Sequence, residues 1–153
     1  MNEHFLYPAA LHVSKEPTII KTILGSCVSV CLFEPNLKFG GMNHYMLPYW
    51  NGQGLASPKY GNIAIEKLIE RMLEMGVNKS SLKAKIFGGG KVIDTTISDF
   101  HIGERNIEVA IEMLAENRIP IIAQSVGGNN GRKILFETHS GNVMHKFVER
   151  TIT

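Results

Sequence analysis

The feature that most constrains this fold is an apolar, β-branched run at residues 28–33 that leads directly into a turn and a return run. Such a run favours a buried strand. Residues 34–37 are typical of a turn, because Pro35 pre-sets the backbone angle of a turn position. Residues 38–47 then predict a second strand that runs back along the first. Part of the core is therefore expected to form around a β-hairpin.

Two reactive side chains flank this hairpin. Cys27 precedes the first strand, directly after a Gly-Ser pair, and His44 lies on the second strand. If the hairpin is centred between Pro35 and Asn36, Cys27 lies directly opposite His44, with Cβ atoms roughly 5 Å apart on the same face. A shift of one residue would place the two side chains on opposite faces. The spacing therefore predicts a thiol beside an imidazole.

Cys27 has two interpretations, and so does His44. Each is most often a buried core residue when it lies in an apolar strand. The alternative is a nucleophile and its base. Gly25 and Ser26 leave the backbone N–H groups of Ser26 and Cys27 near the thiol, where they would bind an oxyanion, and a protonated His44 would lower the thiol pKa. Cys31 lies in mid-strand without a histidine in register, and we expect it in the core.

The rest of the chain predicts two helices and several more strands, packed as a layered α/β or α+β domain over residues 1–153 with mixed or antiparallel sheets. The expected elements are helices over 58–75 and 103–117, strands over 85–87 and 119–126, and a hairpin of 132–138 and 143–149. Ser57 and Pro58 suit the start of the first helix, and Gly76 suits its end. The expected buried stripes are Ile65, Leu68, Ile69, Met72 and Leu73, and Ile107, Ala110, Ile111 and Leu114.

Composition excludes several classes of protein. The chain has 153 residues and a formal net charge of +2, which gives no reason to expect nucleic-acid binding. No apolar run approaches the ~20 residues of a membrane helix, and the first residues lack the pattern of a signal peptide. Only 2 cysteines are present, without the spacing of a metal site or a disulfide framework. We therefore expect a cytoplasmic protein that does not insert into a membrane.

Two glycine runs are ambiguous. Residues 88–91, Gly-Gly-Gly-Lys, suggest a phosphate cradle, but Val92 follows where a P-loop has Ser or Thr, and the glycine spacing differs. Nucleotide binding is therefore a weak alternative. The run at residues 127–132 is interpreted as a structural loop after a buried strand.

The residues resemble a known family, the chemoreceptor glutamine deamidases of bacterial chemotaxis (CheD). The blocks that carry the resemblance are Thr22–Cys31, Gly40–Pro48, Ile86–Gly89, Ile102–Asn106 and Val126–Arg132. Their order and spacing agree with the family over nearly the whole chain. The Leu-Gly-Ser-Cys and Gly-Glu-Arg-Asn blocks are together quite specific.

The resemblance implies the roles of the site residues. Cys27 is then the nucleophile and His44 the base. The family's third catalytic residue is a Thr a few residues before the Cys. Thr22 is the nearest candidate in this chain, whereas an ungapped alignment puts Lys21 at that position. Either of these two neighbours could therefore be the third catalytic residue.

The resemblance also implies a reaction and a fold. The reaction is hydrolysis of a glutamine side chain on a chemoreceptor's cytoplasmic helices to glutamate, with release of ammonia and no metal or organic cofactor. The implied fold resembles that of the cytotoxic necrotizing factor deamidases. An alternative is a binding module, since members of the family also bind a CheC-type phosphatase. A general thiol peptidase or amidase is the weakest alternative, because such enzymes lack the other blocks.

Overall fold

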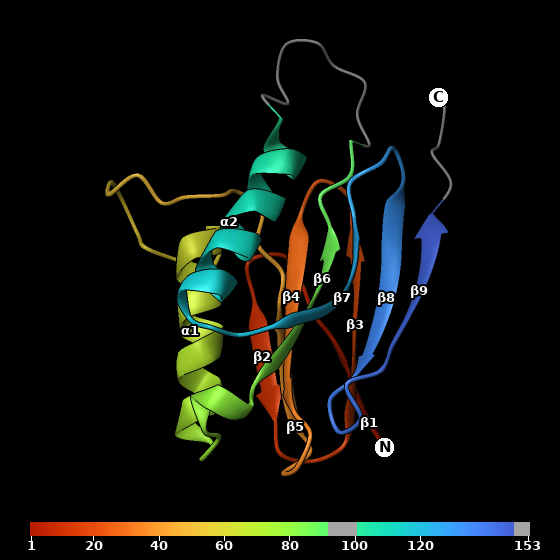
Figure 1. The fold of residues 1–153 in the computed structure, drawn as a ribbon. Coiled ribbons are helices and arrows are strands. Elements are labelled where there is room, and N and C mark those ends of the chain that lie inside the picture. Colours follow the sequence, from red (N-terminus) through yellow and green to blue (C-terminus); the bar gives the residue numbers. More distant parts are fainter. Residues whose placement is uncertain (92–100, 149–153) are drawn as a thin grey trace.

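The computed structural model describes residues 1–91 and 101–148, and it stacks two β-sheets face to face with both helices on one outer face (Figure 1). The sheet beside the helices contains β2 (Leu11–Ser14), β4 (Val28–Glu34), β5 (Phe39–Asn43), β6 (Lys83–Gly88) and β7 (Ile121–Val126). The outer sheet contains β1 (Asn2–Phe5), β3 (Thr18–Leu24), β8 (Gly131–Glu137) and β9 (Val143–Val148). The helices are α1 (Gly61–Glu74) and α2 (Ile102–Glu116), and a short 3₁₀ helix, η1 (Lys79–Ser81), precedes β6.

Both sheets are mixed. The strand order is β2-β5-β4-β6-β7 in the first sheet and β1-β3-β8-β9 in the second. Parallel pairing joins β6 to β7 and β1 to β3, and all other pairs are antiparallel. The predicted layered α+β class with mixed sheets and two main helices is confirmed.

Strand β4 connects two separate cores because its side chains alternate between the sheet's faces. Val30 and Leu32 pack toward the helices, together with the buried side chains of α1 and α2. Cys31 and Phe33 instead pack between the two sheets, against side chains of β3 and β8. All residues of β4 are buried, which explains why its sequence is mostly apolar on both faces rather than alternating between apolar and polar.

The helices differ from prediction at two points. Helix α1 begins at Gly61 and not at residue 58, because the Lys59 carbonyl accepts hydrogen bonds from the N–H groups of Met46 and Leu47 and is tied to the hairpin. The predicted stripes each contain one error, since Leu73 is 39% exposed and Ile111 is 43% exposed. Both lie at the margin of their apolar stripe.

The hairpin register also differs from prediction. Glu34 pairs with Phe39 and Cys31 with Met42, so residues 35–38 form a longer loop with its centre shifted by one residue. A two-residue hairpin turn needs positive φ at its centre, which the ring of Pro35 forbids. The loop instead places Lys38 at φ +61. Cys27 is therefore diagonal to His44 and not directly opposite, but the shift in pairing keeps both on one face.

The N-terminal segment, for which the sequence predicts no pattern, joins the edges of the two sheets. β1 pairs with β3 and β2 pairs with β5. Residues 6–10 cross between them, and we call this connection the N-terminal strap. Ala9 N–H donates to the His44 carbonyl, and the His44 N–H donates to the Ala10 carbonyl. The strap therefore lies alongside His44. Within the described ranges, neither helix has the length and apolar character required to span a bilayer.

Candidate active site

Thr22, Cys27 and His44 come from three different segments that meet at one end of the layer between the sheets. Thr22 lies on β3 between Ile20 and Leu24, whose side chains fill that layer. His44 directly follows β5, and Cys27 directly precedes β4 and packs against the same cluster. Thr22 and His44 are buried, whereas Cys27 is half-buried. The thiol is thus the member of the group that is most open to an incoming molecule.

The Thr22 hydroxyl contacts the His44 ring. Its Oγ1 lies 2.7 Å from His44 Nδ1, and it donates a hydrogen bond of 2.7 Å to the Leu6 carbonyl in the N-terminal strap. A hydroxyl has one proton to donate, so Thr22 Oγ1 must accept from His44. The proton of neutral His44 therefore resides on Nδ1, which leaves Nε2 unprotonated and able to act as a base.

The neighbouring Lys21 has a different environment. Its side chain lies on the opposite face of β3 and forms an ion pair with Glu3, with Nζ 3.0 Å from Oε1. Of the two residues that the sequence leaves open, only Thr22 contacts His44.

Burial keeps both reacting groups uncharged. It lowers the pKa of His44 to about 4 and raises the pKa of the Cys27 thiol, although the thiol's own backbone N–H partly offsets that rise. A resting imidazolium that lowers the thiol pKa, as the sequence suggests, is therefore wrong for the free protein. The pair rests as neutral thiol and neutral imidazole, and ionisation must accompany the chemical step.

The turn that carries Cys27 is held by its carbonyl groups. The Gly25 carbonyl accepts from Gly90 N–H at 3.0 Å, and the Cys27 carbonyl accepts from Gly89 N–H at 2.9 Å. The Ser26 carbonyl between them accepts from Asn106 Nδ2 on α2 at 3.0 Å. Residues 89–90 and Asn106 in the second turn of α2 thus hold the turn that places the thiol.

The Gly88–Gly90 run therefore packs directly against the backbone of the Cys27 turn. Gly88 has φ +109, and a Cβ at this position would lie 2.2 Å from the Cys27 carbonyl oxygen. These glycines permit close approach of backbone to backbone. Sequence reasoning missed this role, as it missed Asn106, because each acts on a turn far away in the chain. One sign was available in the sequence: the spacing of these glycines does not fit a P-loop, which argued for a structural rather than a phosphate-binding role.

The second glycine run is a structural loop as predicted, but the strand before it, β7, is largely exposed and not buried. Arg132, at the start of β8, is buried, and its guanidinium donates to Ser125 Oγ at 3.0 Å and to the Gly127 carbonyl at 2.8 Å. Gly127 N–H donates in turn to the Gly88 carbonyl. The loop is therefore tied to the segment that holds the Cys27 turn.

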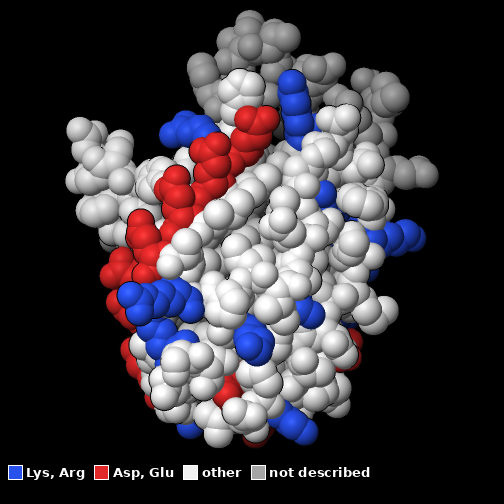
Figure 2. Space-filling view, viewed as in Figure 1, with Lys and Arg blue, Asp and Glu red and all other residues white. Residues whose placement is uncertain are grey.

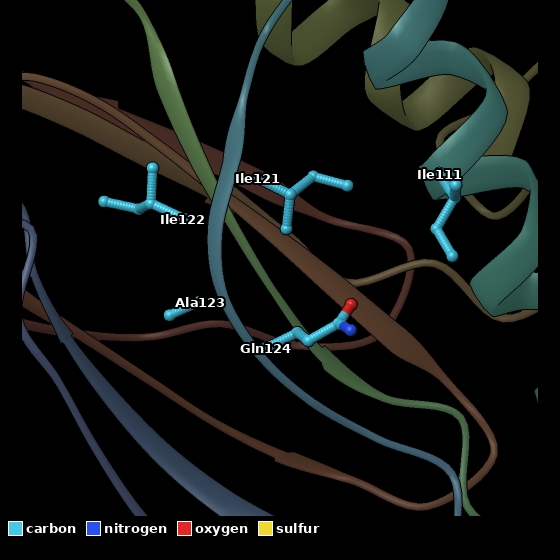
Figure 3. Close-up of a pocket in the computed structure, with 5 residues that line it drawn as sticks. All are labelled: Ile111, Ile121, Ile122, Ala123 and Gln124. Atoms are coloured by element: carbon cyan, nitrogen blue, oxygen red, sulfur yellow. The ribbon is translucent and has the colours of Figure 1, made fainter.

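Two other surface features lie on the helix side of the molecule. A row of exposed glutamates follows α2 and forms a continuous acidic stripe (Figure 2). Its members are Glu104, Glu108, Glu112 and Glu116. An open groove of about 430 Å³ lies between α2 and β7, lined by Ile111 and residues 121–124 (Figure 3). It lies toward the end of β7 that pairs with Ala84, whereas the other end pairs with Gly88 near the Cys27 turn.

The comparisons with known proteins identify the family. A family model described as CheD chemotactic sensory transduction matches residues 46–147. The chain belongs to the CheD family. It is 50% identical over 144 residues to the probable chemoreceptor glutamine deamidase CheD of Trichlorobacter lovleyi, a match that covers 94% of this chain and 89% of the relative. The corresponding protein of Sulfurimonas denitrificans is 47% identical over 148 residues, covering 96% and 95%.

A CheD relative also matches the part of the chain that contains the site. The probable chemoreceptor glutamine deamidase CheD of Rhodospirillum rubrum is 39% identical over 153 residues, covering all of this chain and 86% of its own. Among solved structures, the hypothetical protein YfiH of Bacillus licheniformis matches with a TM-score of 0.52 at 17% identity. That match covers 75% of this chain and 49% of YfiH, and it bears on the fold alone.

Proposed function

We propose that this chain is a cytoplasmic protein-glutamine deamidase, one domain over residues 1–153, that converts glutamines on the cytoplasmic helices of chemoreceptors to glutamates. The names of its CheD relatives supply the substrate. The observation that carries the proposal for this chain is the bond of 2.7 Å between Thr22 Oγ1 and His44 Nδ1. This bond leaves His44 Nε2 free to act as a base. Cys27 lies on the same face of the hairpin as His44.

The first half of the reaction forms a thioester. Cys27 Sγ attacks the carbon of the glutamine side-chain amide while its proton passes to His44 Nε2. The carbonyl oxygen becomes an oxyanion, and the Ser26 and Cys27 N–H groups are the proposed donors that stabilise it. The C–N bond then breaks, the imidazolium returns its proton to the leaving nitrogen, and ammonia departs.

The second half hydrolyses the thioester. His44 removes a proton from water as its oxygen attacks the thioester carbon, and a second oxyanion forms at the same donors. Collapse releases the glutamate side chain and returns the proton to Cys27. Thr22 accepts from His44 Nδ1–H throughout, so it fixes the ring and supports the imidazolium. The steps balance without a metal or an organic cofactor.

The product explains why such a reaction is useful on a receptor. Each turnover replaces a neutral amide with a carboxylate on a helix surface. Adjacent like charges on packed helices disfavour that packing, so the change alters the balance between receptor states. The glutamate is also a site that can be methylated.

The experiment is peptide mass spectrometry of a folded chemoreceptor cytoplasmic fragment incubated with the protein. We expect glutamine-to-glutamate conversion by the unmodified chain and none by Cys27→Ala. The matched control is Cys31→Ala, which removes a thiol from the same layer and is expected to convert glutamine normally. Conversion by Cys27→Ala would refute the assignment of the nucleophile.

Absence of conversion by the unmodified protein would instead favour the adaptor function. A CheC-type phosphatase would then be the partner to test for binding, by titration of the phosphatase with this chain.

A further inference from the structure

We infer that Asn106 is a positioning residue that aims the oxyanion-binding N–H of Cys27, an inference that rests on the proposed deamidase function. Asn106 lies in the second turn of α2 and is fully buried. Its side chain takes no chemical part in the proposed reaction. It contacts the two segments that carry the nucleophile and the base.

The side-chain amide of Asn106 links these segments directly. Nδ2 donates to the Ser26 carbonyl and to the Met46 carbonyl, each at 3.0 Å. Ser26 precedes the nucleophile, and Met46 lies just beyond the base. Tyr45, next to His44, donates its hydroxyl proton to the Asn106 backbone carbonyl. One residue of α2 therefore fixes the Cys27 turn against the His44 segment.

The geometry of the peptide bond extends this contact to the reacting centre. The Ser26 carbonyl and the Cys27 N–H belong to one planar, trans peptide unit, in which they point in opposite directions. A donor that holds the carbonyl oxygen on the α2 side therefore directs the N–H away from α2. Within the described ranges, the Cys27 N–H donates to no other residue, and it contacts its own thiol.

The neighbouring carbonyls do not fix this peptide by themselves. The Gly25 and Cys27 carbonyls accept hydrogen bonds from the N–H groups of Gly90 and Gly89. These bonds hold the residues on either side, but they leave the peptide group between Ser26 and Cys27 free to rotate. Asn106 supplies the missing restraint.

The other end of the amide argues for a functional role. Asn106 Oδ1 is buried and has no hydrogen-bond partner. The orientation of the amide is nonetheless determined, because a flip would place Oδ1 against two carbonyl oxygens. An unsatisfied buried oxygen costs stability, so an apolar residue of similar size would suit packing as well. The two donors of Nδ2 are the property that only the amide supplies here.

The test compares the unmodified protein with Asn106→Leu, which removes both donors at similar volume. Asn106→Asp is a second variant, which replaces the donor with an oxygen that faces the same carbonyls. The matched control is Asn117→Ala at the end of α2, where Nδ2 donates only to the Met113 carbonyl of its own helix. The readouts are kcat and KM for receptor deamidation, the thermal midpoint, and the pH profile of Cys27 alkylation by iodoacetamide, localised by fragment-ion mass spectrometry.

We expect Asn106→Leu to lower kcat by about 100-fold or more, the usual effect of losing one oxyanion donor, with KM within about twofold. The alkylation profile should move to higher pH, because the thiolate loses its aligned N–H. Asn117→Ala should leave kcat and the profile unchanged. A folded Asn106→Leu protein with unchanged kcat would overturn the inference, as would an equal loss of kcat in the control.

The two proposals can fail separately. If the unmodified protein does not deamidate the receptor, the proposed function fails, but the alkylation profile still decides the role of Asn106. A shift to higher pH in Asn106→Leu and Asn106→Asp, absent from Asn117→Ala, supports the positioning role. Identical profiles in all four proteins refute it.

Discussion

Cys27 and Cys31 face the same layer between the sheets, but one lies at the end of that layer and the other in its middle. At the end, Cys27 is half-buried, and the nearby Thr22 and His44 share a hydrogen bond. In the middle, Cys31 is fully buried among apolar side chains such as Phe33 and Phe136. Burial raises the pKa of both thiols, and the rise is large for the fully buried Cys31.

Position along a strand, rather than residue type, therefore separates a reactive thiol from a structural one. A strand buried on both faces has its polar backbone groups satisfied by its neighbours. Just before the strand, the chain turns and its N–H groups become available. Sandwich ends are therefore where a thiol can meet both donors and substrate.

Among the residues at this end of the layer other than Cys27 and His44, substitution of Thr22 is expected to have the greatest effect on activity. Thr22→Val keeps the shape but removes the acceptor of His44 Nδ1–H, so the ring loses its orientation. We expect kcat for deamidation to fall by about 100-fold or more, with partial recovery in Thr22→Ser. Steady-state kinetics on the receptor fragment measure this.

The adjacent Lys21 provides the matched control. Lys21→Ala removes only an ion pair on the other face of β3 and should leave kcat unchanged. A larger loss in Lys21→Ala than in Thr22→Val would contradict the assignment of the third residue.

A smaller effect is expected on stability as the pH falls, and it belongs to the polar end of the layer. The folded pKa of His44, about 4, lies below its ordinary value of 6.5, so the unfolded chain binds the extra proton first. Stability should therefore fall as the pH drops below 6.5 and level off below the folded pKa. Between about pH 7 and pH 5 the loss should be about 2 kcal/mol.

Urea unfolding at the two pH values measures this loss. The same measurement on His44→Gln isolates the contribution of His44 from that of His12, whose pKa burial also lowers. An equal pH dependence in the variant would show that His44 is not the titrating group.

The smallest effect is expected at Cys31, in the apolar middle of the layer. Cys31→Ala leaves a small cavity against packed side chains and should lower the free energy of unfolding by about 1 kcal/mol. Because the thiol takes no part in the reaction, kcat should not change. Chemical denaturation and receptor deamidation, measured on the same preparation, test both statements. A loss of activity without a loss of stability would remove the distinction between the end of the layer and its middle.

Much of the fold could be predicted from the local pattern. The apolar run of β4, the turn at Pro35 and the stripes of α1 and α2 predict the elements and their class, because periodicity reports which face is buried. The two main errors have different causes. Helix α1 begins later than predicted because a tertiary contact ties the Lys59 carbonyl to the N–H groups of Met46 and Leu47. The hairpin loop is longer than predicted because of a local effect, the fixed φ of Pro35.

From the local pattern of strand, turn and strand, the sequence predicts a thiol and an imidazole on one face of a hairpin, and the observed register, although different, keeps them there. The choice between Lys21 and Thr22 required the folded structure, because which face of β3 points toward His44 depends on how the outer sheet packs. The folded structure also decided that burial keeps His44 neutral, and that Gly89, Gly90 and Asn106 hold the Cys27 turn. Those contacts join residues distant in the chain, and desolvation depends on everything packed around a group.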